Sequence, residues 1–113
     1  MVARNKLLTA PPYPVERALK KVSRNLRLAR VRRKLTIEEV AEKIGTGIRA
    51  VRDAESGKAS TGIAVYTALL WLYDLLQPFE DLADPLKDEE GLTLAAAKEN
   101  LRARKSGGLD NDF

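Results

Sequence analysis

The chain contains no cysteine and no histidine in its 113 residues. It therefore has no thiol nucleophile, imidazole base, disulfide or usual zinc ligand, which excludes most small enzymes and zinc-binding folds. No apolar run approaches the roughly 18 residues of a membrane-spanning helix, and the first residues lack the apolar segment of a secretory signal. These absences predict a cytoplasmic protein that is not an enzyme, has no cofactor or metal and does not enter a membrane.

The charge is distributed unevenly along the chain. The net charge is +4, but residues 1–58 carry 15 Lys and Arg against 6 Asp and Glu, whereas residues 59–113 carry 5 against 10. A basic segment attracts polyanions, and an acidic one suits a protein partner or a solvated surface. The length allows one small domain with tails.

The beginning of the chain predicts an arm followed by a long helix. Prolines in "APPYP" deny helical hydrogen bonds, so residues 1–14 are expected to form an extended N-terminal arm. Apolar residues then recur every three or four positions from Val15 to Ala29, which predicts a helix over residues 15–33. The other faces of this helix are strongly basic.

Two short helices follow in close succession. "TIEE" is a Ser/Thr-x-x-Glu capping box at Thr36, so a helix is expected to begin near Ile37 and to end at Gly45. The run over residues 48–56 predicts another short helix, which Gly57 closes.

Two more helices complete the expected fold. One starts after Thr61, and another contains Pro78 in its first turn. The fold class is therefore all-α, with five helices over residues 15–83. Residues 84–113 are expected to form an acidic linker and a C-terminal tail, partly helical or disordered.

The short pair of helices has the spacing of a helix-turn-helix. Helices of two to three turns are not stable alone, so they must brace each other. Ala41 is small where the helices cross, Gly45 tolerates a left-handed turn, and Val51 packs between them. This arrangement leaves Arg49 and Arg52 outside, where they can enter a DNA major groove.

The segments "NLRLARVRRKLTIEEVAEKIG" and "AVRDAESGK" resemble the Cro/repressor-like helix-turn-helix domains, over roughly residues 22–83. The resemblance implies a five-helix, lambda-repressor-like domain that binds double-stranded DNA. It also implies a buried ion pair between Arg30 and Glu55. The chain departs from the family at Ile37, where Gln is frequent, and at Gly47, where Ser or Thr usually caps the helix.

Carried over residue by residue, the resemblance implies two sets of DNA contacts. Arginine can donate two hydrogen bonds to guanine, aspartate can accept one from cytosine, and isoleucine can touch a thymine methyl group. The alternative for each position is a solvated helix face. The base-reading positions are Gly47, Ile48, Arg49, Arg52 and Asp53, and the phosphate-contacting positions are Arg27, Lys34, Thr36 and Lys58.

One short recognition helix reads too few base pairs for useful specificity, so a twofold homodimer is expected. The region after Tyr66 holds more large apolar residues than one small core requires. These residues either form a dimer or partner surface or fill the core of the monomer. The candidates are Trp71, Leu72, Leu75, Leu76 and Phe79.

A second resemblance covers "ALLWLYDLLQPFEDLADPLKDEEGL", which is similar to the tail of HipB-like antitoxins. It implies an antitoxin that binds a HipA-like kinase toxin and represses the promoter of their shared operon. Two alternatives stay open. In the first, the chain is a phage-type or general helix-turn-helix regulator without a toxin. In the second, it is an interaction module that docks an acidic protein and never touches DNA.

Overall fold

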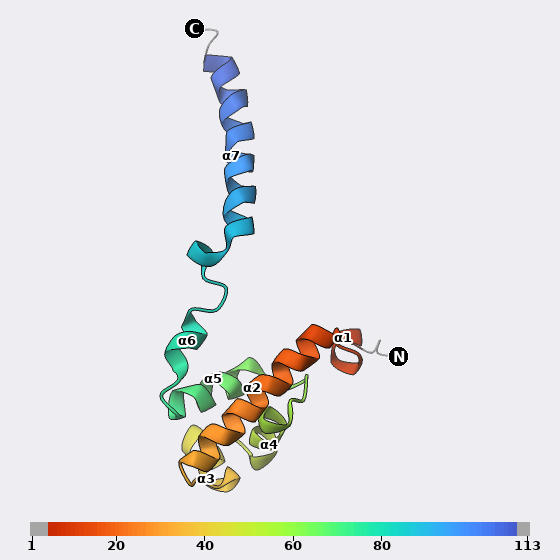
Figure 1. The fold of residues 1–113 in the computed structure, drawn as a ribbon, viewed down its shortest axis with the longest axis vertical. Helices are drawn as coiled ribbons and strands as arrows, with labels where there is room; N and C mark the ends of the chain where they lie inside the picture. Colours follow the sequence, from red (N-terminus) through yellow and green to blue (C-terminus); the bar gives the residue numbers. More distant parts are fainter. Residues whose placement is uncertain (1–4, 111–113) are drawn as a thin grey trace. The chain divides into compact units, whose positions relative to one another are not determined.

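The structure is a computed structural model that describes residues 5–110, and the regular elements in that range are all helical. The all-α prediction is confirmed. The chain divides into two compact units, Met1–Glu80 and Asp81–Phe113. The elements in order (Figure 1) are α1 (Lys6–Thr9), α2 (Tyr13–Arg32), α3 (Ile37–Ile44), α4 (Ile48–Ser56), α5 (Ile63–Leu72), α6 (Leu76–Glu80), a 3-10 turn η1 (Pro85–Lys87) and α7 (Glu89–Asp110).

The two ends of α3 form as the local sequence dictates. The Thr36 hydroxyl accepts a hydrogen bond from the Glu39 N–H at 3.1 Å, and the Glu39 carboxylate accepts one from the Thr36 N–H at 3.1 Å. At the other end Gly45 is left-handed, with φ of 75°, and the Thr46 N–H donates to the Ala41 carbonyl at 2.9 Å. These bonds satisfy backbone groups that the helix ends leave free, and they turn the chain directly into α4.

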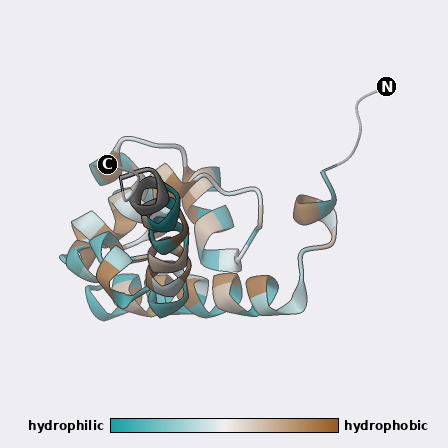
Figure 2. Ribbon diagram, turned by 90° about the horizontal axis from the view of Figure 1, so that it is seen from above, coloured by the Kyte–Doolittle hydropathy of each residue, from teal (hydrophilic) through white to brown (hydrophobic). Residues whose placement is uncertain are grey.

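The core of the first unit lies where α2 packs on α4, and where α3 and α5 close over α4 (Figure 1). Figure 2 shows hydrophilic and hydrophobic residues alternating along α2, as expected for a helix with one buried side. Each fully buried Leu or Val side chain contributes roughly 1.5 to 3 kcal/mol to folding. The buried apolar residues are Leu26, Ala29, Val40, Ala41, Val51, Ala54, Tyr66, Leu69 and Tyr73.

The N-terminal segment is more helical than the prolines indicate. Residues 6–9 form one helical turn, capped by the Asn5 side chain, which accepts from the Leu7 N–H at 3.0 Å. The long helix begins at Tyr13 rather than at Val15, with Pro14 in its first turn, where no helical hydrogen bond is lost. Residues 1–4 of the expected extended arm lie outside the described residues.

The second unit consists of η1 and α7. Where we expected an acidic linker, Asp88 accepts a hydrogen bond from the Gly91 N–H at 3.0 Å, and the helix runs from Glu89 onward. Side chains from 89 to 105 are exposed, apart from the half-buried position of Gly91. The last residues of the expected tail, 111–113, fall outside the described range. None of the helices in residues 5–110 is long and apolar enough to cross a membrane.

Candidate nucleic-acid interface

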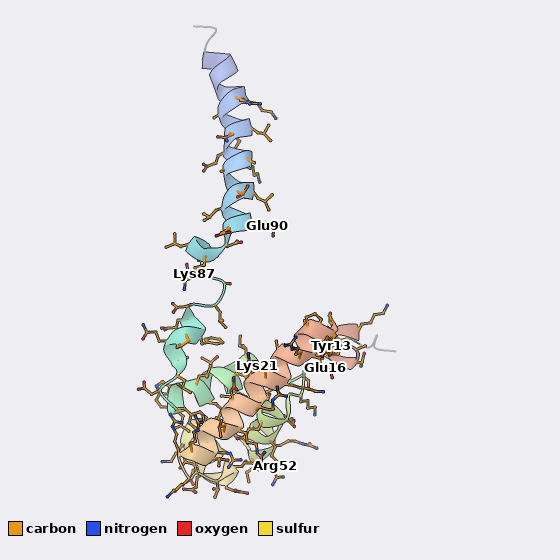
Figure 3. All side chains as sticks on the ribbon, in the orientation of Figure 1. Tyr13, Glu16, Lys21, Arg52, Lys87 and Glu90 are labelled. Carbon is orange, nitrogen blue, oxygen red and sulfur yellow. The ribbon has the colours of Figure 1, made fainter. Side chains whose placement is uncertain are left out.

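The helix α4 has one buried side and one basic side. Val51 and Ala54 are fully buried against the neighbouring helices. At 100° per residue, Arg49 and Arg52 fall on the opposite side, and both are exposed. Figure 3 shows Arg52 at the surface of α4. The packing of the helix therefore fixes which of its residues a ligand can reach.

The start of α4 is also open. Gly47 precedes the helix in an extended conformation, and a Cβ atom added there would have no neighbour within 4 Å. Ile48 follows with 39% of its surface exposed. Four of the five predicted base-reading positions are thus exposed.

Asp53, the fifth position, is half-buried and faces a cation. Its carboxylate lies 3.7 Å from the Lys58 ammonium, and its backbone carbonyl accepts the Lys58 N–H at 3.2 Å. Since Lys58 is a predicted phosphate contact, the two predicted roles share one weak surface ion pair, worth about 0 to 1 kcal/mol.

The other predicted phosphate contacts lie on α2 and in the turn between α2 and α3. Thr36 and Lys34 lie in the turn before α3, and Arg27 lies on α2; all three are exposed. Lys34 is left-handed, with φ of 57°, because it ends α2 in the way a glycine usually does. The Thr36 hydroxyl is already used in the cap of α3, although the free backbone N–H groups there still favour an anion.

Arg30 and Glu55 join α2 to α4. The Arg30 Nε donates to Glu55 at 2.7 Å, a second guanidinium nitrogen donates to the same carboxylate at 3.0 Å, and a third bond of 2.9 Å goes to the Leu35 carbonyl. Only 13% of the Arg30 and 6% of the Glu55 side chain is exposed. The hydrogen bond to Glu55 raises the pKa of Arg30 above its usual value. This pair holds α4 against α2 and is unavailable for reading bases.

A second arginine contact has no signal in the sequence. Arg33 donates to the carbonyls of Ala29 and Tyr73, each at 2.9 Å, and its guanidinium lies 5.2 Å from the centre of the Tyr73 ring. It ties the end of α2 to the end of α5. Nothing local distinguishes Arg33 from its basic neighbours, so only the packing of α5 shows its role.

The outer side of α5 is apolar and uncharged. Residues 59–73 contain no charged side chain, and Trp71 is 63% exposed. Leu75 is also exposed, at 42%. Leu72 packs partly against the core, and Leu76 and Phe79 are half-buried. The proposed dimer or partner set therefore divides into exposed and partly buried members.

Two short helices braced at a left-handed glycine, with arginines on the outer side of the second, define the helix-turn-helix class of DNA-binding folds. Residues 26–70 match the family model described as helix-turn-helix, which supports the Cro/repressor-like family. The match supports a DNA-binding transcription regulator. No match was found among curated proteins or solved structures.

Proposed function

We propose that this protein is a sequence-specific repressor that binds a twofold-symmetric operator as a homodimer through α4. The observation that carries the proposal is the pair of exposed arginines opposite the buried Val51 and Ala54. Among the side chains that the structure describes, those of residues 5–105, neither Arg49 nor Arg52 has an acidic group within 4.0 Å. Both guanidinium groups are therefore free to pair with guanine O6 and N7.

The neighbouring residues suit the same docking. The absence of a side chain at Gly47 lets the duplex approach the start of α4 closely, and the exposed Ile48 can meet a thymine methyl group. Asp53 accepts from a cytosine amine once Lys58 turns to a phosphate. Phosphates on either side are held by the N-terminus of α3 at Thr36 and by three cations. These cations are Arg27, Lys34 and Lys58.

The homodimer is supported by the outer side of α5. A helix that is apolar on all sides is normally buried, yet Ile63 and Trp71 are 69% and 63% exposed. Together with the exposed Leu75, they are apolar side chains that a second copy can cover through a twofold axis. Leu72, Leu76 and Phe79 are half-buried, so they would contribute less area to this interface.

The DNA-binding proposal is tested by selecting duplexes from random sequence and measuring their affinity. We expect a palindromic consensus, and a loss of about 5- to 150-fold for Arg49→Ala and for Arg52→Ala, corresponding to about 1 to 3 kcal/mol each. Arg102→Ala, which removes an exposed arginine from α7, is the matched control and should change little. Unchanged affinity in all three variants would favour an interaction module that does not read DNA.

The protein is further proposed to be the antitoxin of a HipA-like kinase. The support is the resemblance of residues 68–92 to HipB-like tails, together with an acidic second unit whose long helix is exposed. Co-expression with a neighbouring kinase gene should give a stable complex on size-exclusion chromatography and relieve kinase toxicity. A palindrome-binding protein with no kinase complex would instead be a general or phage-type regulator.

A further inference from the structure

The side of α2 that faces away from the core carries a row of cations. At 100° per residue, Arg17, Lys21 and Arg24 share one side of the helix, opposite the buried Ser23, Leu26 and Ala29. All three cations are exposed. We call Arg17, Lys21 and Arg24 the basic stripe. Figure 3 shows Lys21 along α2, with Tyr13 and Glu16 toward its beginning.

The cations of the basic stripe form no ion pairs within the described part of the chain. In the part of the chain that the structure describes, none of its three cations has an acidic group within 4.0 Å. The adjacent Lys20 does, since its ammonium lies 2.9 Å from Glu16. Like charges three or four residues apart on a helix repel each other, so the stripe destabilises the free helix and an external polyanion would relieve it.

A shallow hollow lies over the beginning of the stripe. It has a volume of about 370 Å³ and is lined by Tyr13, Glu16, Arg17, Lys20 and Arg24. Three cations and the exposed Tyr13 line it, and the one carboxylate, Glu16, is paired with one of these cations, Lys20. Four of the five side chains that line the hollow are charged, which suits a solvated phosphate group rather than an apolar ligand.

The stripe is fixed relative to α4. A Cβ atom added at Gly57, which ends α4, would lie 3.3 Å from the Cα of Lys20 and 3.1 Å from its Cγ. The end of the recognition helix therefore rests directly on the backbone of α2, and the Arg30–Glu55 bonds hold the other part of α2. With its 20 residues, α2 is about 30 Å long, and its N-terminal part continues beyond this contact.

We infer that the basic stripe is a second DNA-binding surface, which holds backbone phosphates outside the base pairs that α4 reads. The stripe extends about 10 Å along α2 and lies on either side of the Lys20 contact with the end of α4, so it can reach phosphates next to the base pairs that α4 reads. The stripe reads no bases, because its contacts are with phosphates. This inference rests on the proposed DNA binding and extends it to a longer footprint.

The test compares the full-length protein with the variant Arg17→Gln/Lys21→Gln/Arg24→Gln. Two duplexes carry the same selected site, one trimmed to the site and one extended by a helical turn on each side. On the extended duplex, losing three phosphate contacts should lower the slope of log K against log salt by about 2.7. Between 50 and 200 mM salt, the wild type should then lose about 40-fold more affinity than the variant.

The matched control is Lys98→Gln/Arg102→Gln/Lys105→Gln, which removes the same charge from exposed positions of α7. We expect it to leave the slope unchanged, and we expect the stripe variant to select the same consensus as the wild type. Circular dichroism checks that α2 remains helical, which the relief of repulsion favours.

The inference and the proposed function fail in different ways. If Arg52→Ala abolishes specific binding but the stripe variant keeps the wild-type slope on the extended duplex, only the inference is overturned. An equal loss in the α7 control would also overturn it, because the effect would then come from net charge alone. If the wild type shows no salt-dependent DNA affinity at all, both are overturned.

Discussion

The shorter helix α4 has fully buried residues, and the longer helix α7 is exposed. The nine-residue α4 buries Val51 and Ala54 completely, whereas the 22-residue α7 has no fully buried residue among positions 89–105. A nine-residue helix is marginal in isolation, so neighbours must supply its stability. The comparison teaches that packing, and not the number of turns, decides which helix is held rigidly enough to read a ligand.

Removing the ion pair between α2 and α4 should have the largest effect on the stability of the first unit. We expect Glu55→Ala to lower the free energy of unfolding of the first unit by about 3 to 5 kcal/mol, because the nearly buried Arg30 guanidinium loses its partner. Urea denaturation followed by circular dichroism measures it. Glu16→Ala, which opens a pair whose side chains are 53% and 44% exposed, should cost less than about 1 kcal/mol. Equal costs would contradict a structural role for the inner pair.

Truncating one leucine in each unit sharpens the contrast. Leu69→Ala removes a fully buried side chain and should destabilise the first unit by about 2 to 5 kcal/mol. Leu94→Ala, at a position that is 63% exposed on α7, should change the same transition by less than about 0.5 kcal/mol. Thermal and urea unfolding of both variants measures the difference. A comparable loss for Leu94→Ala would mean that α7 packs on something in the folded protein.

Glycine substitutions at residues with a left-handed backbone conformation test the same contrast with a smaller expected effect. Asp74 has φ of 58° at the end of α5, where the Leu75 N–H donates to the Leu70 carbonyl at 2.8 Å. Asp74→Gly should raise the unfolding free energy by up to about 1 kcal/mol, because glycine accepts this conformation without strain. Ala83→Gly relieves a similar φ of 58° in the second unit and should leave the first unit unchanged. A decrease for Asp74→Gly would show that its side chain contributes a contact.

The smallest expected effect appears at alkaline pH. Burial raises the pKa of Tyr73 above its usual value of about 10. As pH rises above the unfolded value, the unfolded chain loses this proton first, so the folded state loses stability until the folded pKa is passed. The unfolding free energy of the wild type should therefore fall more steeply above pH ~10 than that of Tyr73→Phe. If the unfolding free energies of the two proteins fell equally with pH, ionisation of Tyr73 would not be the cause of the fall.

Local signals predicted the elements that build the candidate interface. The capping box at Thr36 and the glycines at 45 and 57 fix helix ends through the few residues beside them, so α3 and α4 end where the sequence indicates. The outward position of Arg49 and Arg52 follows from helical periodicity once Val51 is buried.

Features that depend on distant packing could not be predicted. Prolines indicated an extended start, but they are compatible with a first helical turn, so α2 begins at Tyr13. The bond from Arg33 to the Tyr73 carbonyl depends on where α5 ends. Since α5 is apolar on all sides, periodicity gave no direction, and only the fold shows that Trp71 faces outward.

The three bonds of Arg30 reach the carboxylate of Glu55 and the carbonyl of Leu35, so one guanidinium sets the tilt of α4 against the chain that enters α3. In the proposed complex, a residue that meets no base would thereby influence the angle at which α4 enters the groove. If the proposed DNA docking holds, substitutions of Arg30 that leave the domain folded should change which duplexes are preferred without altering any of the proposed base-reading side chains.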